Sequence, residues 1–308
     1  MTAPSSERLP DVGLLFPFRA WVRHPVVRAW TTWLFVGLAL VPVLARFLTQ
    51  DSGGTDQAWM FAAYFAAAWF GVLWMLVRPQ AVSGGLLAVL CVAALVVEGP
   101  LAIVLERALD SDTDDLALSI LTVGVPEEFA KLLPVVALAL YVRRRGLAPR
   151  DALFLGAVSG LVFGAAEAVT YVTEYIPLVS GGGVDASLAS VWRFVVGPLL
   201  HALWAGVSGY FVGLAAQYRR PGHIVALTAV GLGATALLHG VYDYAAGGFV
   251  AVLIVLVSVL LFLGYARIGL LGSPAPQQVP IVDPPTMPVA LPSLASGGGL
   301  GVAGRHAR

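Results

Sequence analysis

The chain contains eight long apolar stretches, each close to the roughly 20 residues that a helix needs to cross a bilayer. Backbone polar groups have no water partner in lipid, so single spans of this length are helical. The sequence therefore predicts an all-α, polytopic transmembrane helical bundle of about eight spans. The predicted spans are residues 29–48, 58–77, 82–105, 117–142, 152–176, 191–216, 223–246 and 249–269.

Charge content supports a membrane protein and argues against nucleic-acid binding. Charged residues make up 12% of the chain, against about 25% in soluble domains. Eighteen basic residues balance eighteen acidic ones, so no polybasic domain is available for a nucleic acid, and the expected surroundings are the lipid bilayer. The single cysteine, Cys91, lies in an apolar run. This excludes a disulfide framework and a cysteine-rich zinc site.

Basic and acidic residues occupy alternate connecting loops. Because cytoplasmic loops are enriched in Lys and Arg, the alternation predicts that both termini are cytoplasmic, in a multi-pass protein of the plasma membrane. The basic loops carry Arg19, Arg23, Arg28, Arg78, Arg143, Arg144, Arg145, Arg150, Arg219 and Arg220. The opposite loops carry Asp51, Asp56, Asp110, Asp112, Asp114, Asp115, Glu174 and Asp185.

The predicted spans divide the chain into four parts. Residues 1–28 form a cytoplasmic N-terminal segment, and residues 29–116 contain the first three membrane helices. Residues 117–271 contain helices four to eight and hold most of the polar residues within spans. Residues 272–308 are rich in Pro and Gly, a composition that predicts a disordered tail.

Acidic, basic and imidazole groups interrupt four of the apolar stretches. A charged group at the bilayer centre costs about 2.5–3.5 kcal/mol on insertion scales, so such residues usually face the bundle interior and carry function. At about 1.5 Å rise per residue, five of these groups share a layer roughly 10–16 Å from the outer helix ends. The five are Glu127, Glu128, Glu167, His201 and His239. A further acid, Glu98, is interpreted as a boundary or packing residue.

Spacing within the helices adds detail to this layer. Lys131 follows Glu127 by four residues and Asp243 follows His239 by four, so each pair shares a helical face and both later residues are supporting candidates. Adjacent Glu127 and Glu128 point roughly 100° apart, so one of them is expected to face the reaction centre. One lysine cannot neutralise all the buried acids. The cluster must share protons, admit water or hold a cation.

Small residues repeat at four-residue spacing on two of these stretches. Gly156, Gly160 and Gly164 do so on the fifth, and Gly209 and Gly213 do so on the sixth. Small residues in this pattern let membrane helices approach closely. We therefore predict tight packing between the fifth and sixth helices and their neighbours.

Residues 117–246 resemble the PrsW-type intramembrane peptidases, which are distantly related to CAAX prenyl endopeptidases and bacteriocin-processing membrane proteins. That family carries a Glu-Glu-x-x-Lys motif, a Phe-x-x-x-Glu motif and later membrane histidines. The matching positions in this chain are Glu127, Glu128, Lys131, Phe163, Glu167, His201 and His239, with Asp243 four residues after the last histidine.

The resemblance implies proteolysis of a membrane-protein or peptide substrate, in the family's best-known branch an anti-sigma factor. It implies that Glu127 or Glu128 activates a water molecule. His201 and His239 then either stabilise the oxyanion or, together with Glu167, hold a zinc ion. A metal-dependent and a metal-free mechanism both fit the sequence.

Other chemistries fit the sequence less well. The chain has no His-Glu-x-x-His zinc motif and no Gly-x-Gly-Asp aspartyl motif. A serine–histidine dyad of Ser208 with His239 would have to bridge about 15 Å along the membrane normal. A proton-coupled transporter could use the same buried acids as a relay, but the expected internal repeat is not visible.

Overall fold

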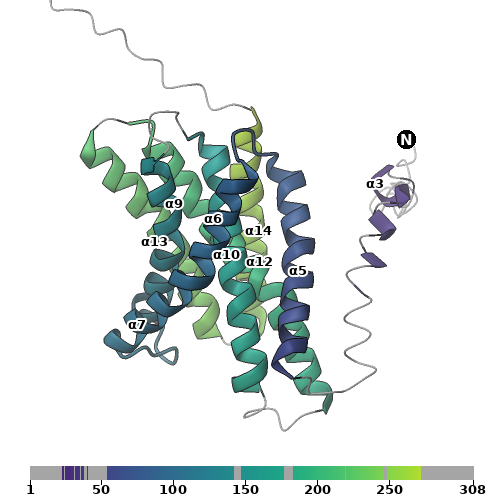
Figure 1. Cartoon of the computed structure of the whole chain (residues 1–308). Coiled ribbons are helices and arrows are strands. Elements are labelled where there is room, and N and C mark those ends of the chain that lie inside the picture. The colour runs from purple at the N-terminus through teal and green to yellow at the C-terminus, as the bar shows by residue number, and fades with distance from the viewer. Residues whose placement is uncertain are drawn as a thin grey trace, which may run out of the picture. The chain divides into compact units, whose positions relative to one another are not determined.

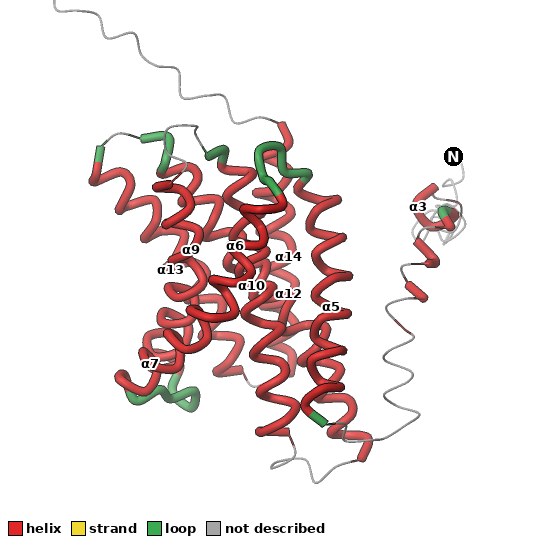
Figure 2. The backbone as a smooth tube through the Cα atoms, in the orientation of Figure 1, coloured by secondary structure: helices red, strands yellow, loops and turns green. Residues whose placement is uncertain are grey.

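The computed structural model describes residues 54–141, 147–176, 183–218, 220–245 and 248–271, together with scattered positions between 23 and 40. Within these ranges the chain is helical with short loops and contains no β-strand (Figure 2). The helices are α3 (Pro25–Arg28), α5 (Thr55–Val77), α6 (Gly84–Ala93), η1 (Ala94–Glu98), α7 (Gly99–Leu109), α8 (Leu116–Leu118), η2 (Ser119–Gly124), α9 (Val125–Tyr141), α10 (Pro149–Thr170), η3 (Tyr171–Tyr175), α12 (Gly183–Ala215), α13 (Pro221–Ala245) and α14 (Gly248–Leu271).

Six helices are long and apolar enough to cross a membrane, and this confirms an all-helical, multi-pass protein. They are Thr55–Val77, Gly84–Ala108, Pro149–Tyr175, Ala186–Ala215, Pro221–Ala245 and Gly248–Ile268. These match six of the eight predicted spans. The predicted fourth span is helical from Leu116 to Tyr141, but its three charged residues lower its apolar character. The predicted first span lies largely outside the described residues, as do both termini and the tail.

Two helices form the interior of the bundle. In the most apolar stretch of α10, 83% of the residues are buried, and in that of α12, 72% are buried. The corresponding share is 22–28% in the other four spanning helices. Those four expose many large apolar side chains, such as Val89 and Leu260. Exposed apolar surface of this extent is expected where a helix faces lipid. Figure 1 shows α10 and α12 in the centre of the bundle, with α5, α9, α13 and α14 around them.

The close contact between α10 and α12 depends on glycine. A methyl group on Gly160 would overlap the backbone carbonyl of His201, and one on Gly156 would overlap that of Ala205. On α12, a methyl group on Gly209 would overlap the carbonyl of Ala152. The predicted small-residue packing is therefore confirmed. It places α10 directly against the turn of α12 that carries His201.

Within the described residues, three helical stretches contain a π-helical turn: η1 ends at Glu98, η2 ends just before α9, and η3 continues α10. An extra residue in a helical turn rotates the side chains that follow, and such turns are frequent at functional sites. Here η2 ends three residues before Glu127. It therefore helps to set which face of α9 points inward.

We expect Gly160→Ala to destabilise the protein by about 1–3 kcal/mol, because its methyl group must push α12 away from α10. Gly197→Ala is the matched control, since Gly197 lies on α12 and a methyl group there would meet no atom within 4 Å beyond its own stretch of helix. The control should be neutral or slightly stabilising, because alanine is the better helix former. Thermal unfolding in detergent measures both. Equal melting temperatures for the two variants would contradict the close contact.

Candidate functional site

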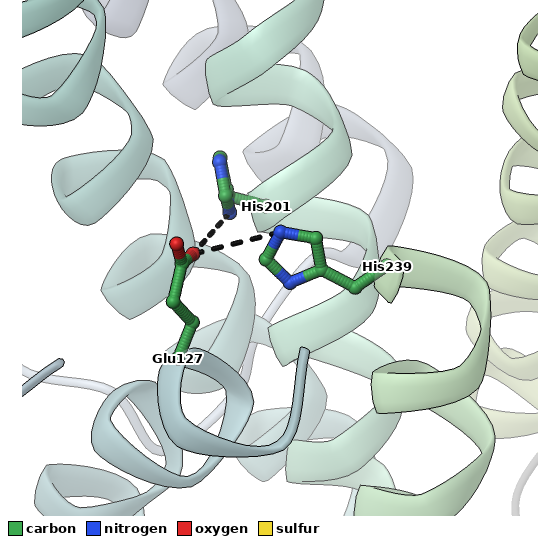
Figure 3. Close-up of side chains that lie close together, drawn as sticks. All are labelled: Glu127, His201 and His239. Atoms are coloured by element: carbon green, nitrogen blue, oxygen red, sulfur yellow. Dashed lines mark ion pairs between the residues drawn. The ribbon is translucent and has the colours of Figure 1, made fainter. Parts of the chain in front are cut away.

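The acids and imidazoles predicted from the sequence meet inside the bundle. Glu127 comes from α9, His201 from α12 and His239 from α13, and Figure 3 shows the three side chains pointing toward one another. Glu127 Oε2 lies 3.8 Å from His201 Nδ1 and 3.6 Å from His239 Nε2. All three residues are buried. The structure thus brings together groups that lie far apart in the chain.

Lys131 supplies the positive charge at the centre of this cluster. Its side chain is fully buried, and Nζ lies 2.7 Å from Glu128 Oε1 and 3.3 Å from Glu127 Oε2. The same nitrogen lies 2.7 Å from His201 Nδ1 and over the ring of Phe163. A buried carboxylate is costly unless it is paired and hydrogen-bonded. Lys131 therefore compensates both glutamates of the pair at once.

The contacts of His201 define which ring nitrogen carries the proton. A lysine ammonium can only donate hydrogen bonds, so Nδ1 of His201 accepts from Lys131. The other ring nitrogen, Nε2, then carries the proton and donates to Glu167 Oε2 at 2.6 Å. Glu167 thus orients His201. It contacts the ring from the side opposite Lys131.

The ring of His239 is held on its edges and on its face. Nδ1 lies 3.0 Å from Glu128 Oε1, and Nε2 lies 3.2 Å from Asp243 Oδ2. The indole of Trp204 stacks on the ring at a centroid distance of 4.6 Å. Trp204 is anchored in turn, because its Nε1 donates to Ser258 Oγ at 2.8 Å. Carboxylate partners of this kind fix the orientation of a functional imidazole.

Glu127 and Glu128 have different surroundings. A cavity of about 1210 Å³ is lined by Glu127, Glu167 and Asp243 but not by Glu128. Glu128 is fully buried, and one of its carboxylate oxygens has no hydrogen-bond partner among the described residues. Of the two adjacent glutamates, Glu127 is therefore the one that faces the cavity.

Glu127, His201 and His239 together fit a zinc ion in donor type and in spacing. Each offers one ligand atom, and these atoms lie within 4.8 Å of one another. Ligand atoms around a tetrahedral zinc at 2.0–2.1 Å lie about 3.3 Å apart, close to the 3.6 and 3.8 Å found here. Lys131 lies against His201 Nδ1 and would have to shift. Glu167, predicted as a metal ligand, lies outside this trio and contacts the other nitrogen of His201.

Several residues near the site were not predicted. Glu106 and Arg193 line the cavity. Glu98 is fully buried, so packing is the better of its two interpretations; it contacts Ser159, whose hydroxyl lies 2.8 Å from the Lys131 carbonyl oxygen. By contrast Ser208 pairs with Thr235 at 2.7 Å, in keeping with the rejection of a serine–histidine dyad.

Replacing Lys131 should lower the stability of the protein, because Lys131 compensates two buried carboxylates at once. Lys131→Met leaves two buried carboxylates without their cation, and breaking a buried ion pair in this way costs about 3–5 kcal/mol. The double variant Lys131→Met/Glu128→Gln removes one uncompensated charge and should recover part of the loss. Thermal unfolding in detergent is the measurement. Wild-type stability in Lys131→Met would show that the cluster does not need this charge.

A comparison with known protein families gave a match that covers most of the bundle. Residues 71–266 match the family described as PrsW family intramembrane metalloprotease. Neither the curated proteins nor the solved structures gave a match. The matched range includes every residue of the Glu127, His201 and His239 cluster and the helices that hold it. The chain therefore belongs to the PrsW family of intramembrane metalloproteases.

Proposed function

We propose that the protein hydrolyses a peptide bond in or near the membrane segment of another membrane protein, and that Glu127, His201 and His239 carry the chemistry. The observation behind this proposal is that the three side chains converge and that one of them, Glu127, lines a large cavity. The cavity, at about 1210 Å³, exceeds the roughly 300–1,000 Å³ of sites for small ligands. It suits a stretch of peptide better than a small solute.

The walls of the cavity favour a hydrophobic substrate. Leu95, Ile103, Phe163 and Val252 contribute apolar surface, and Trp59 and Trp192 add aromatic surface. A membrane segment of a substrate can replace lipid against such walls at little cost in hydration. A small hydrophilic solute of a transporter would leave most of this apolar surface without a partner. The lining therefore supports the peptidase over the transporter.

The chain's own residues can perform the proton transfers of hydrolysis. Glu127 is the glutamate of the pair that reaches the cavity, so its Oε2 would accept the proton of an attacking water and return it to the leaving amine. His201, oriented by Glu167, and His239, oriented by Glu128 and Asp243, flank that oxygen. His239 Nε2 faces Glu127, and its N–H would stabilise negative charge on the carbonyl oxygen. His201 faces Glu127 with its unprotonated Nδ1, so it would serve this role only through Nε2.

A zinc ion would be held by Glu127, His201 and His239. When bound, it supplies a Lewis acid that polarises the scissile carbonyl and promotes ionisation of water. In that case Glu167 and Asp243, which also line the cavity, are the remaining carboxylates able to hold a proton near the substrate.

The proposed substrate is a membrane protein with a single span, and the proposed location is the plasma membrane. A single-span anti-sigma factor in the plasma membrane is the first substrate to test, in keeping with the resemblance of the motifs. The acidic loops and the cavity-lining ends of α10, α12 and α13 share one side in the predicted topology. Cleavage is therefore expected toward the outer side of the membrane.

Glu127→Gln should lower cleavage of a single-span substrate by about 10²–10⁴-fold, the usual contribution of a general base. Glu128→Gln is the matched control: it makes the same chemical change one residue away, at a side chain that does not reach the cavity. The loss of cleavage in Glu128→Gln should be smaller and should be proportional to the loss of thermal stability in that variant. Cleavage assayed in proteoliposomes separates the two. Undiminished cleavage by Glu127→Gln would remove the proposed base.

Metal content tests the zinc set separately. Purified wild-type protein should hold about one zinc per chain, and His239→Ala should lose most of it, because a site with two remaining ligands binds weakly. Elemental analysis gives the content, and a chelator followed by zinc addition should abolish and restore cleavage. Full activity in protein shown to carry no metal would eliminate the zinc version and leave the metal-free mechanism.

A further inference from the structure

The cavity carries an uneven set of charges. Four acidic residues line it, Glu106, Glu127, Glu167 and Asp243, and Arg193 is the one basic residue in the described lining. Lys131 does not reach the cavity. A peptide that enters this space meets negative charge around the reacting groups and positive charge at a single place. Recognition of an anionic group can therefore occur at Arg193 and not elsewhere on the described walls.

Arg193 is positioned by an aromatic ring, and its N–H groups have no hydrogen-bond partner in the described ranges. Its guanidinium carbon lies 3.6 Å from the centre of the Tyr171 ring, and the side chain is half-buried. No hydrogen bond or ion pair joins Arg193 to another residue in the described ranges. Stacking fixes the plane of the guanidinium, while its N–H groups stay available for a carboxylate in a two-point contact.

An arginine in this position is costly without a role. Charged groups within spans are rare and usually have a partner or a function, and Arg193 lies inside the spanning part of α12. Glu167 and Asp243 balance the charge of Arg193 at longer range, but neither forms a direct pair with it. Neither carboxylate lies within 4 Å of the guanidinium, since the pairs found at that limit join Glu167 to His201 and Asp243 to His239.

We propose that Arg193 binds a carboxylate of the substrate peptide and so positions the scissile bond. This inference rests on the proposed peptidase function. Arg193 precedes His201 by eight residues on α12, a separation of about 12 Å along the helix axis. An extended peptide advances about 3.3 Å per residue. The carboxylate is thus about three or four residues from the bond that is cut.

Two kinds of carboxylate have this chemistry: an Asp or Glu side chain, and the free α-carboxylate at a chain end. Synthetic single-span peptides distinguish them. One peptide carries Asp near the end of its span, a second carries Asn at that position, and a third has the Asn with a free C-terminal carboxylate at the same place. All other chain ends are amidated. Each peptide is fluorescently labelled at its N-terminus.

Binding is measured by fluorescence anisotropy with full-length Glu127→Gln protein in detergent, so that no peptide is cut. We expect at least one carboxylate peptide to bind about ten-fold more tightly than the Asn peptide, in line with a charge-assisted hydrogen bond. Adding Arg193→Gln should reduce the ratio to about one, and Arg193→Lys should keep part of it. Arg107→Gln is the matched control, because Arg107 is exposed near the end of α7 and does not line the cavity. That variant should keep the full ratio.

Three results would overturn the inference. The first is equal binding of all peptides to protein that retains Arg193. The second is a loss in Arg193→Gln that is equal for carboxylate and Asn peptides, as charge balancing would give. The third is no binding of any peptide. The proposed function fails differently: carboxylate peptides would bind with the expected preference, yet protein with Glu127 intact would leave every peptide uncut.

Discussion

The structure depends on mutual compensation among charges that are buried inside a membrane bundle. Glu127 and Glu128 are adjacent and both buried, and Lys131 contacts both of them within 3.3 Å. Neither glutamate could remain ionised at this depth without a cation or hydrogen-bond donors. The imidazoles of His201 and His239 supply further contacts from two other helices. Three helices are thereby tied to one cluster, and the arrangement that neutralises the charges also assembles the reacting groups.

The scaffold supports this cluster by bringing backbones close together. Gly160 lets α10 lie directly on the carbonyl of His201, and a methyl group on Gly164 would lie only 2.6 Å from the His201 ring atom Cδ2. His201 therefore has little freedom to rotate, and Glu167 on α10 holds its Nε2. On the other side, Trp204 stacks on His239. Small residues allow the approach, and large aromatic residues fill the space beside it.

The helices and the polar layer could be predicted from the sequence for one physical reason. Ionisable groups are so costly in an apolar span that Glu167, His201 and His239 stand out, and their depths follow from helical rise alone. Which face of each helix points toward the cavity could not be predicted in this way. Glu127 and Glu128 differ by about 100°, and only packing, together with the π-helical turn before α9, decides which one reaches the cavity.

Two residues of the cavity were harder to predict, because they lie at or beyond the ends of the predicted spans 82–105 and 191–216, where charges are common. Glu106 lies near the end of α7, and Arg193 lies eight residues before His201; neither is conspicuous in a hydropathy pattern. The signal that was available for Arg193 is its sign, since it is basic on the side of the membrane where acidic residues predominate. For Glu167, the sequence left its partner open. The contact with His201 Nε2 shows an orienting position, which helical spacing alone does not distinguish from metal binding.

The proposed chemistry requires that the three central residues lie close together in the membrane. Cysteines placed pairwise at positions 127, 201 and 239, in a chain with Cys91→Ser, can be treated in native membranes with a short bifunctional thiol reagent. We expect efficient cross-linking of all three pairs, and none between position 127 and a lipid-facing control such as Leu260→Cys. If the reagent reaches and labels the cysteines but cross-links none of the three central pairs, the proposed proximity is contradicted.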